Sequence, residues 1–221
     1  ADVTGGVIEL GPPTGNLTDT GTLTFTDVDL TDVHIVDPTI TASTGALGTL
    51  TASVTTDTTG SGTGGVITWN YSVAAADVEF LAKDQEKVET FTLTLDDQNG
   101  GTIDRTVSVT ITGTNDNPIV SAINAGTVTE DDAVQTINLL AGGQTDVDSN
   151  TTLSATNIVV TDNLGGSVTF TDNNDGTIDI DPDQFGSALN TGDSRTLTVN
   201  YEVSDGTIGT ANTATLIVNG V

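Results

Sequence analysis

The sequence contains no cysteine and only one histidine, His34. Without thiols, the chain has neither disulfide bonds nor thiolate metal sites. A single imidazole also excludes a histidine-based metal centre. If the protein binds a metal, its ligands must therefore be oxygen atoms.

Basic residues are almost absent as well, with four Lys and Arg against 31 Asp and Glu, for a formal net charge of -27. Nucleic acids and anionic lipids bind proteins through basic side chains that displace counterions, so both are excluded as partners. Cations are the expected ligands. An acidic chain without thiols fits a bacterial protein that is secreted or displayed on the cell surface.

No apolar run approaches the ~18 residues of a membrane-spanning helix, so we predict no membrane insertion. No basic-then-apolar signal segment opens the chain, and we expect it to be part of a longer protein. Its 221 residues suffice for one large all-β domain or for two domains of about 100–150 residues.

Alternation of apolar and polar residues is the dominant pattern, as in residues 91–95 and 107–111. This period of two predicts half-buried strands, and Gly/Asn/Asp clusters such as 57–65 and 96–101 predict the turns between them. We therefore expect an all-β protein of antiparallel sandwiches. The aromatic residues predicted to fill their cores are Phe25, Trp69, Phe91, Phe170 and Tyr201.

An internal repeat divides the chain. Residues 5–10 recur loosely at 126–131, and "FTDVDL" (25–30) recurs as "QTDVDS" (144–149). We predict two modules, residues 1–116 and 117–221, joined end to end.

Acidic and amide residues occur at matching places in the two modules. Each module has an Asp-x-Asp pair near its start and an Asp at a late turn, and the linker contains Asn-Asp-Asn. A sandwich brings loops from distant strands together at each pole, and calcium takes six to eight oxygen ligands. The pattern predicts calcium sites rather than a catalytic centre, so we expect no enzymatic activity.

Several motifs carry a family resemblance. They are "GTLTFTDVDLTD" (21–32), "ETFTLTLDDQNGGT" (89–102), "ITGTNDNP" (111–118), "NLLAGGQTDVDSN" (138–150) and "RTLTVNYEVSDG" (195–206). The chain resembles two tandem cadherin-like repeats, also called VCBS repeats, of bacterial RTX-type surface adhesins. The resemblance implies two Ig-like β-sandwiches that act as a calcium-rigidified spacer supporting cell adhesion and biofilm formation. As a fragment we expect it to be monomeric, extracellular, and partnered by calcium and neighbouring repeats.

The resemblance also implies the calcium ligands. For the joint between the modules they are Glu9, Asp84, Glu86, Asn115, Asp116, Asn117, Asp146, Asp148 and Asp205. Asp27, Asp29 and Asp97 would form an equivalent site towards a preceding module, and Glu130 would serve a following one.

Other motifs are weaker. Residues 171–183 resemble a calcium loop, but its first and last positions are Thr171 and Pro182 instead of acidic residues, so we predict a hairpin. "GSGTGG" (60–65) leads into a strand instead of a helix, which excludes dinucleotide binding. The triplet "DTG" (19–21) is similar to the signature of aspartic proteases, whose chemistry needs two such carboxylates, but the chain lacks a second triplet. His34 is predicted to be an exposed strand residue.

The main alternative is a calcium-dependent module that binds a glycan or a protein. It requires an exposed aromatic side chain beside an acidic loop, and the candidates are Tyr71, Phe80 and Phe185.

Overall fold

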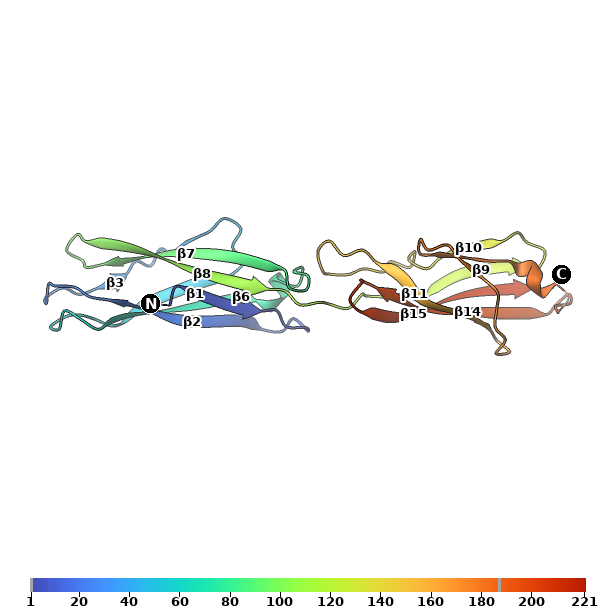
Figure 1. The fold of residues 1–221 in the computed structure, drawn as a ribbon, viewed down its shortest axis with the longest axis horizontal. Helices are drawn as coiled ribbons and strands as arrows, with labels where there is room; N and C mark the ends of the chain where they lie inside the picture. The colour runs from blue at the N-terminus through green and yellow to red at the C-terminus, as the bar shows by residue number, and fades with distance from the viewer. Residues whose placement is uncertain (1, 187) are drawn as a thin grey trace. The chain divides into compact units, whose positions relative to one another are not determined.

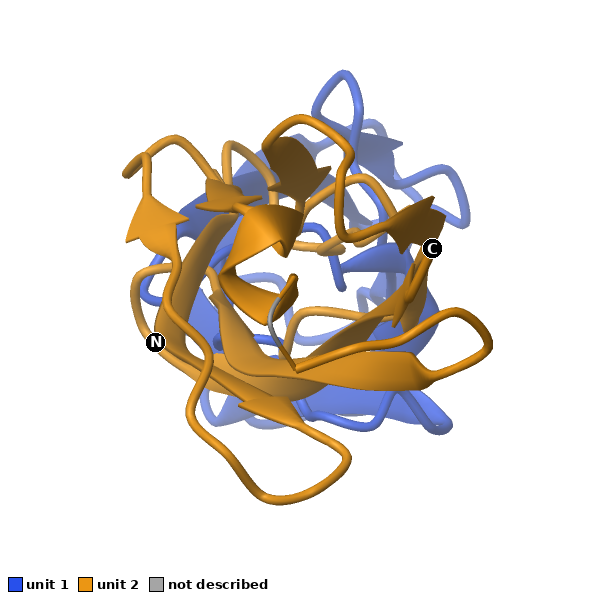
Figure 2. Ribbon diagram, turned by 90° about the vertical axis from the view of Figure 1, so that its right-hand side faces the viewer, with its two compact units in different colours: residues 1–116 blue, residues 117–221 orange. Residues whose placement is uncertain are grey.

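The computed structural model describes residues 2–186 and 188–221, and its regular secondary structure is almost entirely β-strand, which confirms the all-β prediction. The contacts divide the chain into two compact units, unit 1 (residues 1–116) and unit 2 (residues 117–221). Figure 2 distinguishes the two units by colour, and in unit 2 the strands form two layers around an interior.

Unit 1 contains two sheets (Figure 1). The first consists, in spatial order, of β1 (Thr4–Ile8), β8 (Thr102–Thr112), β7 (Glu86–Asp96) and β3 (Ile35–Val36), with β4 (Thr41–Ala42) also paired to β7. The second consists of β2 (Asn16–Phe25), β6 (Gly65–Ala74) and β5 (Thr49–Thr56). A short 3-10 helix, η1 (Ala75–Asp77), follows β6.

Unit 2 has the same plan. One sheet has the order β11 (Ser154–Asp162), β14 (Ser194–Ser204), β15 (Gly209–Asn219) and β9 (Ile123–Thr129). The other has the order β10 (Gln135–Asn138), β13 (Thr177–Ile180) and β12 (Thr171–Asp172). The 3-10 helix η2 (Pro182–Phe185) lies between β13 and β14.

The sheets are not purely antiparallel, and the sequence-based expectation is wrong on this point. β1 runs parallel to β8, and β9 runs parallel to β15. In each unit the first strand therefore pairs with the last. Alternation of side chains is the same in both kinds of ladder, so it does not reveal strand direction.

The cores follow the alternation. In β7 the side chains of Phe91, Leu93 and Leu95 are buried while the intervening threonines are less so. Trp69 and Tyr201 are buried, as predicted, whereas Phe25 and Phe170 are only partly buried against their cores.

The predicted hairpin in residues 171–183 is confirmed. β12 and β13 pair antiparallel, and Asn174 (φ 59°) and Gly176 (φ 85°) adopt left-handed backbone conformations in the turn between them. Asn and Gly are the residues that tolerate this conformation.

We predict that Gly113→Ala destabilises unit 1 by about 1–3 kcal/mol, the usual cost of overpacking. A Cβ at Gly113 would overlap the carbonyl oxygen of Leu81 and lie 2.5 Å from that of Ala82. Backbone atoms cannot move aside as a side chain can. Urea denaturation would measure the loss.

The matched control is Gly6→Ala, because a Cβ there meets its nearest atom, the Thr110 carbonyl oxygen, at 3.6 Å. An unchanged midpoint for Gly113→Ala would contradict this packing.

Candidate metal centres

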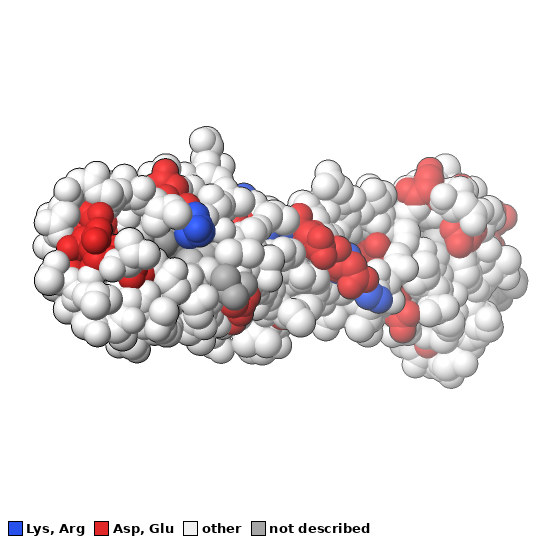
Figure 3. Space-filling view, turned by 60° about the vertical axis from the view of Figure 1, so that its left-hand side comes forward, with Lys and Arg blue, Asp and Glu red and all other residues white. Residues whose placement is uncertain are grey.

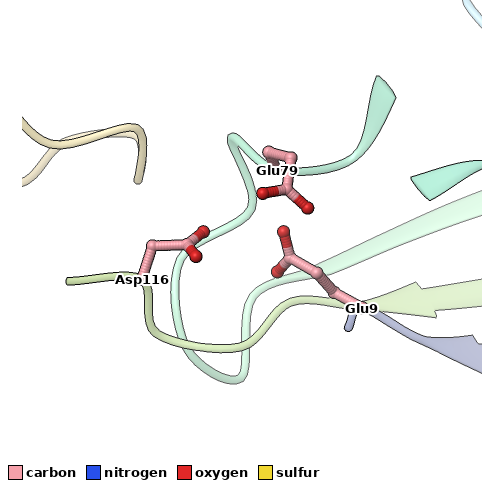
Figure 4. A group of neighbouring side chains, drawn as sticks. All are labelled: Glu9, Glu79 and Asp116. Carbon is pink, nitrogen blue, oxygen red and sulfur yellow. The ribbon is translucent and has the colours of Figure 1, made fainter. Parts of the chain in front are cut away.

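Three carboxylates of unit 1 converge near the end of β1. Glu9 follows β1, Glu79 follows η1, and Asp116 lies four residues beyond the end of β8 at Thr112. Each offers an oxygen atom, and the three oxygens lie within 4.8 Å of one another. Figure 4 shows the three carboxylates turned towards a common point from three separate segments. We call this group the linker-side cluster.

Backbone hydrogen bonds hold the linker-side cluster in place. The Glu9 N–H donates to the Thr112 carbonyl (2.9 Å), and Glu9 Oε2 accepts from the Thr114 N–H (2.7 Å). These bonds continue the β1–β8 ladder into the linker. Glu79 lies between the buried side chains of Val78 and Leu81, which anchor its loop to the core. The carboxylates are therefore brought together by the fold of unit 1 itself.

This arrangement suits a hard cation. Glu9 is 2% exposed, and Glu79 and Asp116 are half-buried. Two unit charges at such a distance repel by about 3–4 kcal/mol when the effective dielectric constant is about 20. A divalent cation coordinated by the oxygens would convert this repulsion into attraction, and an all-oxygen set of carboxylates is what calcium prefers.

The linker-side cluster contains two residues predicted from sequence, Glu9 and Asp116. Glu79 was missed, since no local motif distinguishes it. The loose "DQE" match instead led to Asp84 and Glu86, which are exposed and belong to neither group of three acidic residues that the described chain forms. The Asn115 side-chain amide donates to the Asp116 carbonyl.

A second group in unit 1 consists of Asp27, Asp32 and Asp97, again with oxygens within 4.8 Å of one another. Asp97 Oδ1 accepts from two N–H groups of its own turn, those of Asn99 and Gly101 (both 2.8 Å). Asp29, predicted here, is exposed, and its N–H donates to Asp27 Oδ1 (2.8 Å). Asp32 occupies the place in this group that was predicted for Asp29.

The prediction for His34 is wrong, because the side chain is buried and lies before β3 rather than in a strand. Its Nε2 is 3.0 Å from Asp27 Oδ2, and its Nδ1 is 2.7 Å from Asp57 Oδ1. Burial opposes a charge on the ring, but the hydrogen bonds to Asp57 and Asp27 outweigh it and raise the pKa of His34 above its ordinary value. A hydrogen bond from the Asp29 N–H and another from His34 lower the pKa of Asp27.

In unit 2 the predicted ligands lie in three segments: Asn117 precedes β9, Asp146 and Asp148 lie between β10 and β11, and Asp205 lies between β14 and β15. Asp148 is buried, and its N–H donates to Asp146 Oδ1 (2.9 Å). Asp146 Oδ2 is buried and accepts no hydrogen bond from the described residues. Asp205 Oδ1 accepts from the Ile208 N–H (2.7 Å), and Asn117 is exposed. None of these acidic residues joins a group of three in the part of the chain that the structure describes.

Glu130 repeats the setting of Glu9. Its N–H donates to the Asn219 carbonyl (3.1 Å), and its Oε1 accepts from the Val221 N–H (2.9 Å). The side chain is buried, and Oε2 accepts no hydrogen bond from the described residues. The internal repeat thus extends to the hydrogen bonds around an early glutamate.

The surface carries the charge imbalance of the sequence. Figure 3 shows many Asp and Glu side chains and few Lys and Arg on the face in view. Among the described residues, no helix is both long enough and apolar enough to span a membrane.

Residues 114–219, somewhat less than half of the chain, match the family model described as "Cadherin-like domain". This family consists of non-enzymatic adhesion domains that generally bind calcium and are typically extracellular. The expectation of a non-enzymatic protein is therefore confirmed. No curated protein matches the sequence.

Solved structures similar to the chain include three cadherin fragments. Domains EC1–3 of mouse clustered PcdhgC3 share 15% identity at a TM-score of 0.47, with 100% of this chain and 66% of that chain covered. Mouse cadherin-23 EC22–24 shares 19% identity at 0.46, covering 100% and 63%. Drosophila N-cadherin EC1–4 shares 18% identity at 0.48, covering 100% and 48%. The chain thus spans about half to two thirds of their length.

Proposed function

Because residues 114–219 match a cadherin-like domain, we propose that the chain is a calcium-binding spacer from a large bacterial cell-surface adhesin. In this proposal two β-sandwich modules, divided at residues 116 and 117, follow one another in a longer repeat array. Calcium makes the linker rigid and so holds an adhesive tip away from the cell, in support of adhesion and biofilm formation.

The observation that carries the proposal is the convergence of Glu9, Glu79 and Asp116 beside the linker. Three acidic groups from three separate segments favour a bound cation over a solvated turn. From the family resemblance we propose that Asn115, Asn117, Asp146, Asp148 and Asp205 supply further oxygen ligands. The group Asp27, Asp32 and Asp97 is proposed to serve a preceding module, and Glu130 a following one.

Extracellular calcium modules bind at about 0.1–1 mM. A calcium-rich medium would therefore hold the linker rigid, whereas the low free calcium inside a cell would leave it flexible during export.

Small-angle scattering of the intact chain tests the role of the linker. In millimolar calcium we expect a longer maximum dimension than in excess chelator at the same ionic strength, because calcium replaces repulsion between acidic groups by shared coordination. Asp146→Asn with Asp148→Asn is expected to remove the difference while the strand content measured by circular dichroism stays unchanged. Identical scattering profiles with and without calcium would reject the spacer role.

A second candidate, glycan binding, is favoured by one observation. Tyr71 and Phe185 are buried, but Phe80 is 41% exposed and directly follows Glu79 of the linker-side cluster. Screening on a glycan array in calcium separates the two functions. A spacer shows no binding, whereas a lectin shows binding that Phe80→Ala abolishes.

A further inference from the structure

The turn between β7 and β8 contains the dipeptide Asn99-Gly100. An asparagine side chain can react with the backbone nitrogen of the next residue to form a five-membered succinimide. When most residues follow the asparagine, their Cβ and their restricted backbone hinder this attack. Glycine has no Cβ and a freer backbone, so it does not hinder the attack. Asparagine followed by glycine is therefore the dipeptide most prone to this reaction.

The geometry of the turn leaves this dipeptide accessible. Asn99 and Gly100 are both exposed, and Gly100 has a φ of 105°, which only glycine adopts readily. The turn is closed by bonds on either side of the reacting atoms, since Asp97 Oδ1 accepts from the N–H groups of Asn99 and Gly101. The Gly100 N–H, which must attack, donates no hydrogen bond to any described residue. The attacking nitrogen therefore has no competing hydrogen bond among the described residues, and the exposed side-chain amide of Asn99 is held by a hydrogen bond of 3.2 Å from its Nδ2 to the Asp97 carbonyl.

The other asparagine followed by glycine in the chain, Asn219-Gly220, has the opposite setting. Asn219 ends β15, where it pairs with Ser194 of β14 and Thr129 of β9. The Gly220 N–H donates to the Asp193 carbonyl (2.9 Å). A strand between two neighbours cannot take up the conformation that ring closure needs, so the fold protects this site. Asn219 therefore serves as an internal control for Asn99 within the same molecule.

We propose that Asn99 is a site of spontaneous deamidation in the folded protein. The Gly100 nitrogen forms a bond to Asn99 Cγ and gives up its proton, and the side-chain nitrogen leaves as ammonia. Water then opens the succinimide at one of its two carbonyls, which yields aspartate or isoaspartate. The net change is one amide and one water converted into one carboxylate and one ammonium ion, with no oxidant or enzyme.

The product changes the acidic end of unit 1. Asn99 lies two residues from Asp97, which belongs to the group with Asp27 and Asp32. Deamidation adds a negative charge to the same turn, and the isoaspartate form also lengthens the backbone by one methylene. The modification is therefore a time-dependent change in the charge of this pole, independent of whether the linker-side cluster binds calcium.

Peptide mapping by mass spectrometry tests this inference on the intact chain incubated at mildly alkaline pH. We expect the peptide containing Asn99 to convert to the deamidated mass faster than the peptide containing Asn219, because only the first lies in an exposed turn. In urea the two sites are expected to convert at similar rates, because only the fold distinguishes them. Asn99→Gln should remove the fast site, since glutamine would have to form a larger and less favourable ring.

Equal conversion of the two sites in the folded protein would overturn the inference. So would an Asn99 peptide that stays intact in the folded protein while it converts in urea, because the turn would then protect the amide. Neither outcome bears on calcium binding, so this inference can fail separately from the proposed function.

Discussion

Replacing Glu9, Glu79 and Asp116 together by Gln, Gln and Asn is expected to abolish calcium binding at the linker-side cluster and to stabilise the calcium-free chain. The amides keep the shape of the side chains, and Gln at position 9 can still accept the hydrogen bond from the Thr114 N–H. They remove the mutual repulsion of three negative charges, about 3–4 kcal/mol for each pair before solvent screening reduces it. Opposite effects with and without calcium are the signature of a cation site.

Calorimetric titration with calcium and thermal melts in chelator would measure the two effects. The matched control is Asp84→Asn with Glu86→Gln, because these carboxylates are exposed and outside both acidic groups. The control should retain calcium binding. If it loses binding while the triple variant keeps it, the ligands are those of the "DQE" motif and our assignment of Glu79 is wrong.

Trp69→Ala is expected to destabilise unit 1 by about 3–5 kcal/mol, which is a large share of the 5–15 kcal/mol typical of a folded domain. The indole is fully buried and packs directly against the backbone of two glycines. A Cβ on Gly21 would lie 2.6 Å from Trp69 Cε2, and a Cβ on Gly5 would lie 2.8 Å from Trp69 Cη2. Trp69 Nε1 also donates to the Asp2 carbonyl (2.9 Å), which holds the start of the chain. Both the packing and this hydrogen bond are lost in the variant.

Differential scanning calorimetry would resolve this effect, because Trp69 belongs to the core of unit 1 alone. We expect the transition of unit 1 to move to lower temperature and that of unit 2 to stay in place. Phe80→Ala is the control, since it removes an aromatic side chain of the same unit that is 41% exposed. A shift of both transitions by Trp69→Ala would show that the units do not unfold independently.

The strands and their buried faces were predictable because they depend on local pattern. The alternation of Phe91, Leu93 and Leu95 with threonines corresponds to β7, and its inward face is buried as expected. The hairpin at Asn174 and Gly176 was predictable for the same reason, since its turn chemistry lies within a few residues.

Features that depend on distant partners were not predictable in this way. His34 has the pattern of an exposed residue, yet its side chain is buried and its ring is hydrogen-bonded to Asp57, 23 positions further along the chain. Glu79 resembles any acidic loop residue until the fold brings it beside Glu9 and Asp116. The only sequence signal was its position directly before a run of apolar residues, Phe80 and Leu81, which is too common to indicate a ligand.

The most direct test of the calcium site is the melting temperature of the intact 221-residue chain. It is measured in excess chelator and again in calcium at about ten to a hundred times the expected dissociation constant. Binding at that concentration stabilises the folded domain by about 1.4–2.7 kcal/mol. For a domain of about 100 residues this raises the melting temperature by about 5–15 °C. We predict such a rise for unit 1 in calcium, and a smaller one in equimolar magnesium. No rise, or an equal rise in sodium chloride of matched ionic strength, would contradict it.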